Sequence, residues 1–270
     1  MNFRRDVNSR TLIMGILNCT PDSFSDGGLY IDHDKAVDHA LKMIEEGCDI
    51  VDVGGESTRP GYTPVDDEVE LSRVLPVVKT LASGKTMISV DTTSDLVASK
   101  CVEACGRMII NDISGDLKAS NFASLAATNG CGLVIMFNAR RNGECGGSII
   151  GRAVAEVSDN IEFALSKGVK EDNIIVDPGI GFGTTREQDI ELTNELAKLS
   201  FDGRFPILYA ASRKRIIKEL SSFSSDPDLR DDASDALALF AVSRGASIIR
   251  THRIAPLKAQ LEVFDRFTGG

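Results

Sequence analysis

The chain of 270 residues carries 30 lysine and arginine residues against 40 aspartate and glutamate residues, which gives a net charge of -10. Hydrophobic residues make up 42% and charged residues 26%, the usage of a globular protein, so a disordered or fibrous chain is excluded. The chain lacks the basic surplus typical of nucleic-acid-binding proteins, and its apolar runs are shorter than the ~20 residues of a membrane span. Neither nucleic acid nor a membrane is an expected partner.

Cysteine usage indicates a reducing compartment. The six cysteines contain no CxxC pair and have no histidine nearby, and they are Cys19, Cys48, Cys101, Cys105, Cys131 and Cys145. This scatter favours reduced thiols over disulfides or a metal site. The polar first ten residues do not resemble a secretory signal. We therefore expect a soluble, cytoplasmic protein.

Short apolar or β-branched runs alternate with longer segments of helical period along the whole chain. In chain order, the expected strands are 11–17, 49–53, 86–90, 108–111, 132–136, 174–176, 206–209 and 246–249. The expected helices are 34–46, 68–81, 94–104, 122–128, 153–166, 186–199, 233–243 and 256–267. Strands that are apolar throughout, rather than alternating, indicate a parallel sheet covered on both faces.

Eight such strand–helix units fit an α/β fold of the (β/α)8 TIM barrel type, with residues 1–270 forming a single domain. A doubly wound sheet is the alternative, although it typically has five or six strands. Four segments fit no regular element: 20–28, 54–65, 138–152 and 221–232. The first three follow the carboxyl ends of strands, the face on which barrels build their active sites.

Polar residues stand at or just past most strand ends: Asn18, Asp52, Asp91, Asn111, Asn138, Asp177, Ser212, Arg213, Lys214, Arg250 and His252. Asp91, Asn111 and Asp177 are short hydrogen-bonding side chains that each follow apolar core residues. Unpaired polar groups at such depth cost ~1–3 kcal/mol each, so these residues need partners. A flat heterocycle with several N–H donors would satisfy them.

The opposite side of this ring is expected to be basic and to bind phosphate. Its residues follow the seventh and eighth strands, where barrels frequently hold phosphate groups, and they are Arg213, Lys214, Arg250 and His252. Arg59, in the loop after the second strand, is placed to reach the same region. Asn18 offers a neutral amide oxygen, a suitable ligand for Mg²⁺ alongside phosphate oxygens and water.

Seven segments of the chain closely resemble dihydropteroate synthases, a family of pterin-binding barrels. They are GILNCTPDSFSDGG at 15–28, DVGGESTRPG at 52–61, SVDT at 89–92, NDISG at 111–115, DPGIGFG at 177–183, SRK at 212–214 and RTH at 250–252. The first two are long and highly specific. The resemblance implies a barrel that joins 6-hydroxymethyl-7,8-dihydropterin pyrophosphate to p-aminobenzoate, giving dihydropteroate and pyrophosphate with Mg²⁺ as cofactor. It also implies a homodimer and a sulfonamide target.

The resemblance further implies a role for each matching residue. The pterin ring would be held by Asp91, Asn111, Asp177 and Lys214, and the pyrophosphate by Thr58, Arg59, Arg250 and His252. Asn18 would contact Mg²⁺, and p-aminobenzoate would lie among Ser212, Arg213, Phe24 and Pro60. The catalytic residues implied are Asp91, Asp177, Lys214, Arg250 and His252.

The sequence departs from the family pattern at three places. Phe137-Asn138-Ala139-Arg140-Arg141 replaces the usual Met-His-Met segment after the fifth strand, Arg215 replaces a serine, and Arg253 replaces an aspartate. We expect Phe137 to alter packing under the pterin pocket and the added arginines to alter anion affinity.

Two alternative functions are compatible with a barrel of this kind. A pterin-binding paralogue without synthase activity would not require the pyrophosphate side, whereas Arg59, Lys214 and His252 are all present. A methyltetrahydrofolate-type methyltransferase would share the barrel but would not need the Thr-Pro-Asp-Ser-Phe loop at 20–24.

Overall fold

A computed structural model describes residues 10–20, 29–56, 65–141, 147–223 and 225–268. Its strands are β1 Leu12–Asn18, β2 Ile50–Gly54, β3 Met87–Asp91, β4 Ile109–Asp112, β5 Gly132–Met136, β6 Ile174–Asp177, β7 Ile207–Tyr209 and β8 Ala246–Thr251. Its α-helices are α2 Leu29–Glu45, α3 Asp67–Leu81, α4 Asp95–Cys105, α5 Phe122–Asn129, α6 Ile149–Ser166, α7 Arg186–Asn194, α8 Arg215–Leu220, α9 Pro227–Ser243 and α10 Ala255–Thr268. Short 3-10 helices are η2 Leu117–Ala119, η3 Glu171–Asn173 and η4 Leu196–Ser200.

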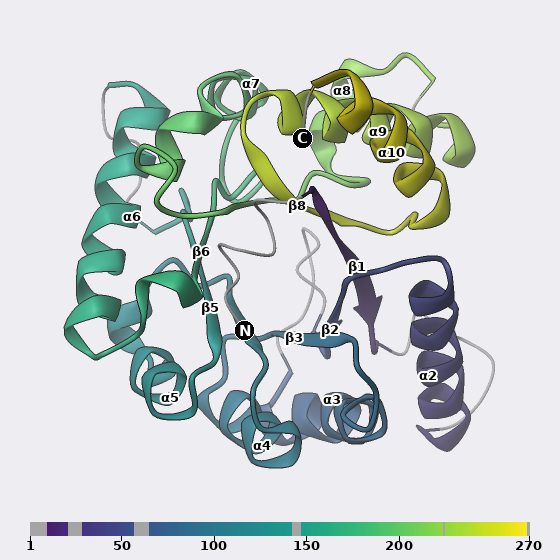
Figure 1. The fold of residues 1–270 in the computed structure, drawn as a ribbon, viewed down its shortest axis with the longest axis vertical. Helices are drawn as coiled ribbons and strands as arrows, with labels where there is room; N and C mark the ends of the chain where they lie inside the picture. The colour runs from purple at the N-terminus through teal and green to yellow at the C-terminus, as the bar shows by residue number, and fades with distance from the viewer. Residues whose placement is uncertain (1–9, 21–28, 57–64, 142–146, 224, 269–270) are drawn as a thin grey trace.

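The strands close into a barrel. They follow the order β1 to β8, every neighbouring pair is parallel, and β1 pairs with β8. Closure excludes the doubly wound sheet, which would leave two free edges, and confirms the expected (β/α)8 barrel. Figure 1 shows the helices as a ring around these strands, so each strand is buried on both faces, as the apolar strand sequences predict.

Side chains alternate along each strand between two separate layers of the core. One cluster fills the barrel and consists of Leu12, Met14, Ile50, Ile109, Val134, Ile175, Leu208 and Ile248. The other, larger cluster lies between the strands and the helices and includes Ile13, Val51 and Val176. Because neighbouring residues on a strand face opposite ways, this division fixes which polar side chains at the strand ends point into the barrel.

The structure corrects the extent of two of the irregular segments. Helix α6 begins at Ile149 rather than at 153, because Ser148 caps it by accepting a hydrogen bond from the Gly151 amide. Helix α9 begins at Pro227 rather than at 233, because Asp226 accepts from the Asp228 and Leu229 amides.

Helical segments also differ from expectation at three other places. Helix α2 begins at Leu29 rather than at 34. Helix α8, directly after Lys214, is not predicted by the sequence pattern because it has only six residues. The helix expected over 186–199 ends at Asn194 and continues as η4. Within the described part of the chain, no helix has the length and hydrophobicity required to span a membrane.

Candidate active site

Polar side chains from several strands meet at the carboxyl end of the barrel. Asn18, Gly54, Asp91 and Asn111 are aligned across β1 to β4, and Asp177 ends β6. They share the inward face with the barrel core, since each stands an even number of positions from Met14, Ile50, Met87, Ile109 or Ile175. The structure therefore brings together the short hydrogen-bonding residues that the sequence predicted to converge.

The two aspartates of this group lie in surroundings that disfavour their charge. The Asp91 side chain is 12% exposed, and burial raises its pKa to about 7, although the nearby Arg250 guanidinium acts in the opposite direction. Burial likewise raises the pKa of Asp177, whose Oδ1 accepts a hydrogen bond of 2.6 Å from the Gly179 amide. Both carboxylates retain an oxygen that can accept from a ligand.

Arg250 lies among these acids rather than on an opposite wall. Its Nε donates to Asp52 at 2.6 Å and its Nη2 to Asp91 at 2.7 Å. The expected division into an acceptor side and a separate basic side is therefore wrong for Arg250. The physical reason is that a guanidinium with a 15% exposed side chain needs a buried counter-charge, and its long side chain reaches past β1 to find two.

Asp52 is a residue of this cluster to which sequence analysis gave no role. It is completely buried, and its Oδ2 accepts from Arg250 and, at 3.2 Å, from Asn111 Nδ2. Asp52 lies two positions before the end of β2. Because side chains alternate between the two faces of a strand, Asp52 points into the barrel like Ile50, and this alternation is the sequence signal that could have identified it.

Lys214 approaches from the other side of the barrel mouth, just before α8. Its Nζ donates to the Ile180 carbonyl at 2.7 Å and lies 4.5 Å from the centre of the Phe182 ring. Burial lowers the pKa of Lys214 to about 8, with Arg250 contributing in the same direction and Asp177 opposing it. The amine is thus close to losing its proton near neutral pH.

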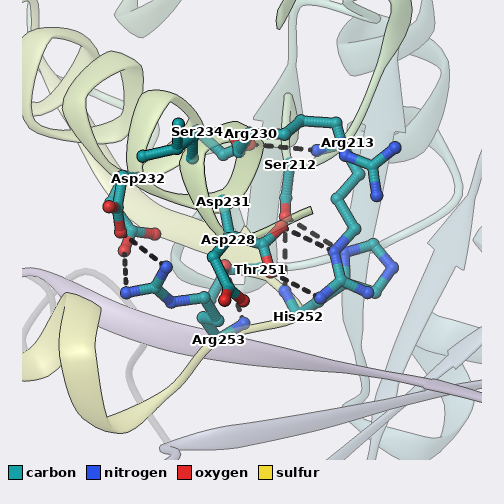
Figure 2. A network of polar contacts seen from close by, with 12 residues as sticks. Ser212, Arg213, Asp228, Arg230, Asp231, Asp232, Ser234, Thr251, His252 and Arg253 are labelled. Carbon is teal, nitrogen blue, oxygen red and sulfur yellow. Dashed lines mark hydrogen bonds and ion pairs between the residues drawn. The ribbon is translucent and has the colours of Figure 1, made fainter. Parts of the chain in front are cut away.

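Ser212 and His252 form a hydrogen-bonded pair where β7 and β8 end, with Ser212 Oγ 3.0 Å from His252 Nδ1. Arg213 lies next to them and is held from α9, as Figure 2 shows. Its Nε and Nη2 bind Asp231 at 2.7 and 2.6 Å, and its amide donates to Ser234. No motif in the sequence marks Asp231 or Ser234 as a site residue.

Four of the predicted site residues, Phe24, Thr58, Arg59 and Pro60, lie outside the described residues. Asn18 is half-buried at the end of β1. No group of three metal-binding side chains occurs among the residues that the structure describes.

The structure shows where the unusual residues lie. Phe137 belongs to the outer core cluster and carries Arg152 5.3 Å above its ring, so it packs under α6 and not beneath the barrel mouth, contrary to expectation. Arg141 pairs with Asp116, and Arg140 lies 5.4 Å from the Phe182 ring.

The two other replacement arginines are also engaged. Arg215 donates to the Thr184 carbonyl and pairs with Glu219. Arg253 pairs with Asp232 (Figure 2). It also lies 3.5 Å from Asp235. Both guanidinium groups therefore form ion pairs with the protein's own carboxylates.

Taken together, the mouth offers carboxylate and amide oxygens from β3, β4 and β6 beside a lysine of lowered pKa. Such a set binds a flat ring that presents several N–H donors on one edge and a carbonyl on another. The Ser212–His252 pair and Arg213 border the same mouth and are suited to an anionic group.

Comparison with known proteins agrees with this arrangement. Residues 14–252 match the family described as pterin binding enzyme. A dihydropteroate synthase of Bacillus subtilis is 39% identical over 258 residues, covering 95% of this chain and 88% of that protein. A dihydropteroate synthase of Clostridium beijerinckii is 46% identical over 213 residues, covering 78% of each.

A solved structure of a Clostridium difficile dihydropteroate synthase is 38% identical and superposes with a TM-score of 0.88, covering 96% of this chain and 97% of that one. A Xanthomonas albilineans dihydropteroate synthase is 35% identical, with a TM-score of 0.88 and coverage of 97% and 94%. The sequence motifs, the closed barrel and the polar mouth thus lead to one assignment: this chain belongs to the dihydropteroate synthases, a transferase family of pterin-binding enzymes.

Proposed function

We propose that the protein condenses 6-hydroxymethyl-7,8-dihydropterin pyrophosphate with p-aminobenzoate to give 7,8-dihydropteroate and pyrophosphate. The observation that carries the proposal is the convergence of Asp91, Asn111, Asp177 and Lys214 at one barrel mouth, in a chain of this family. The related C. difficile and X. albilineans structures were solved in the presence of pteroic acid and 4-aminobenzoic acid, which supports the same pair of ring systems.

In this proposal the pterin lies flat in the mouth. Asp91, Asn111 and Asp177 accept hydrogen bonds from its N–H groups, and Lys214 donates to its carbonyl or ring nitrogen. The centre of the Phe182 ring lies 4.5 Å from Lys214 Nζ. This ring limits the movement of the amine and so directs it toward the pterin. Charge-assisted hydrogen bonds of this kind are about twice as strong as neutral ones, and they orient the methylene that reacts.

The remaining residues receive the charged parts of the substrates. The pyrophosphate is bound by His252 and by the Arg250 N–H groups that Asp52 and Asp91 do not engage, with Thr58 and Arg59 from outside the described residues. Ser212 and Arg213, with Phe24 and Pro60, border p-aminobenzoate. The Asp231 carboxylate holds Arg213 in place at two points, which presents a fixed guanidinium to the second substrate.

The reaction proposed is a dissociative substitution. The bond between the pterin methylene and the pyrophosphate oxygen breaks, and its electron pair leaves with pyrophosphate. The amine lone pair of p-aminobenzoate then forms the new C–N bond, and the proton of the resulting arylammonium passes to pyrophosphate or water. Asp91 and Asp177 favour the cationic methylene, while Arg250 and His252 stabilise the departing charge.

Mg²⁺ belongs to this proposal as a companion of the pyrophosphate. Asn18 supplies one amide oxygen at the mouth, and the described chain holds no larger ligand group, which fits a cation held mainly by phosphate oxygens and water. When bound, Mg²⁺ would neutralise charge on the leaving group. Replacing Asn18 with alanine should weaken the binding of pyrophosphate-bearing ligands and leave the binding of a phosphate-free pterin unchanged.

The cellular setting and assembly are also proposed. Within the described chain the five cysteines, Cys19, Cys48, Cys101, Cys105 and Cys131, are free thiols, which supports a cytoplasmic location. A homodimer through barrel helices is supported by large apolar side chains exposed on α9 and α10, among them Phe240 and Val263. Sedimentation of the purified chain tests the dimer.

A coupled assay tests the reaction. Pyrophosphate release that requires both substrates, together with formation of dihydropteroate, is the expected result. Release without dihydropteroate would contradict the synthase and favour a protein that only binds pterin. A series of p-aminobenzoate analogues that differ in amine nucleophilicity tests the mechanism. The rate of cleavage of the pterin C–O bond should depend little on this nucleophilicity. A strong dependence would contradict the dissociative step.

A further inference from the structure

Asp52 occupies a central place in the site, although the proposed function assigns it no substrate contact. It is completely buried on β2, one inward-facing position below Gly54 and thus below the level of Asp91. Its Oδ2 accepts from Arg250 Nε at 2.6 Å and from Asn111 Nδ2 at 3.2 Å. One carboxylate oxygen therefore binds two residues to which the proposed function assigns substrate contacts.

The contact with Asn111 fixes the direction of an amide. An ionised carboxylate can only accept hydrogen bonds, so it can face the NH₂ end of Asn111 and not its carbonyl end. With Nδ2 directed at Asp52, the amide oxygen Oδ1 lies on the other branch of the side chain, away from Asp52. A ligand that meets Asn111 from the open mouth then finds a hydrogen-bond acceptor.

The contact with Arg250 has a related effect. Nε and Nη2 of Arg250 are engaged by Asp52 and Asp91, so these donors are not offered to a ring lying in the mouth. The oxygens of Asp91, Asn111 and Asp177 also lie at this end of the pocket. All of them are acceptors, and together they favour a ligand edge made of donors.

Energetics argue that Asp52 does not serve stability. Its Oδ1 has no hydrogen-bond partner among the described residues, and neither has Oγ of Ser89, its buried partner in register on β3. A buried ion pair with an unsatisfied oxygen commonly contributes no more to stability than a neutral group of the same shape. We therefore attribute to Asp52 the orientation of its two partners, Asn111 and Arg250.

We propose that Asp52 is a positioning residue that sets the donor–acceptor specificity of the pocket, by holding Asn111 with its carbonyl oxygen toward the ligand. This inference rests on the proposed pterin-binding function. It predicts that the site accepts a pterin, whose 2-amino group donates, and discriminates against the 2-oxo analogue, whose corresponding oxygen accepts.

Calorimetric titration of the full chain with two phosphate-free probes tests the inference: 6-hydroxymethylpterin and its 2-oxo analogue. The wild type should prefer the pterin by about tenfold or more, because a site with fixed acceptors rejects an analogue that cannot donate to them. In Asp52→Asn the new side-chain amide can present either its oxygen or its NH₂ group to Asn111, so Asn111 is no longer held in one orientation. The preference should therefore fall by about three- to tenfold, mainly through weaker pterin binding.

Asp112→Asn is the matched control. Asp112 is also a buried carboxylate near the barrel mouth, but it accepts from the Ser114 amide on the outer face of β4. Its variant should retain the wild-type preference. Asp52→Ser, which keeps a small polar group without charge, should reproduce the loss seen in Asp52→Asn.

Each outcome separates the two proposals. If the wild type binds neither probe, the proposed function itself fails. If the wild type discriminates and folded Asp52→Asn retains the same preference, the pterin function stands and the role of Asp52 is overturned. If both Asp52 variants lose their cooperative thermal transition while Asp112→Asn keeps it, Asp52 serves stability, which also overturns the inference.

Discussion

Arg213 and Asp231 are joined at two points, Nε to Oδ1 at 2.7 Å and Nη2 to Oδ2 at 2.6 Å. Arg213 has a positive φ of 59°, an unusual conformation for a residue with a side chain. The two-point ion pair and the Ser234 hydroxyl hold this conformation from α9 (Figure 2). A helix that carries no substrate contact thus shapes the loop that ends β7.

Replacing Asp231 with alanine should therefore weaken the binding of p-aminobenzoate more than the binding of the pterin substrate. Without its partner, the Arg213 side chain regains rotational freedom, and the strained backbone is free to relax. We expect the KM for p-aminobenzoate to rise about three- to tenfold with little change in pterin affinity. Asp232→Ala is the control, because Asp232 pairs with Arg253 and not with Arg213. Equal effects of both variants on KM would contradict the assignment.

Binding of a phosphate-free pterin should follow a bell-shaped pH curve. The pKa of Asp91, which is raised to about 7 by burial and by Asp52 and Glu70 against Arg250 and Lys214, defines the acid limb. Below it the carboxyl is protonated and loses acceptor strength. The lowered pKa of Lys214, about 8, defines the alkaline limb, above which the amine loses its charge.

Two variants assign these limbs. Asp91→Asn should weaken binding and flatten the acid limb, because an amide does not titrate. Lys214→Arg keeps its charge at all accessible pH values and should flatten the alkaline limb. Titrations monitored by pterin fluorescence provide the curves. An acid limb that stays in place in Asp91→Asn would show that another group controls it.

Gly179 is required where the loop after β6 approaches Phe137. Its φ is +70°, and a Cβ at this position would lie 1.8 Å from the Phe137 carbonyl oxygen. Gly106 has a similar φ of +73° with nothing within 4 Å of the point where a Cβ would lie, so it isolates the conformational cost. Because Gly106 has a ψ of −115°, outside the left-handed helical region, Gly106→Ala should cost about 1–3 kcal/mol of unfolding free energy with activity intact.

Gly179→Ala should cost clearly more in urea unfolding and should also lose most of the activity. The added methyl group must displace the segment that donates a backbone hydrogen bond to Asp177. If Gly179→Ala matched Gly106→Ala in both measurements, the close approach to Phe137 would have no consequence for the site.

Arg253 neutralises acids of α9, so reversing its charge should destabilise the fold. It lies 2.7 Å from Asp232 and 3.5 Å from the buried Asp235, whose pKa burial raises to about 6. In Arg253→Asp the pKa of Asp235 should rise further. A raised carboxyl pKa means that stability present at low pH is lost as pH rises through that pKa.

The difference in Tm between Arg253→Asp and the wild type should therefore be small near pH ~5 and reach several degrees near pH ~8. Arg253→Lys, which keeps the charge, should stay close to the wild type at both values. A Tm difference of Arg253→Asp that is independent of pH would argue that lost packing, and not charge, is responsible.

The apolar periodicity of the chain was sufficient to place the strands. The expected strand 132–136 coincides with β5, and the other strand boundaries differ by at most two residues. The predicted helix starts were less accurate than the strand boundaries, since α6 and α9 begin several residues before the first residue of their apolar pattern. Caps such as Ser148 and Asp226 act through single local hydrogen bonds, which periodicity does not report.

The sequence alone thus determined the barrel, the family and the residues at the strand ends, because strand period and short motifs are local properties. Only the tertiary structure showed that Arg250 binds Asp52 and Asp91, that Phe137 faces outward, and that α9 holds Arg213. Buried charges seek partners within the reach of their side chains. On a closed barrel those partners lie up to 198 positions away in the chain, so only the folded geometry identifies them.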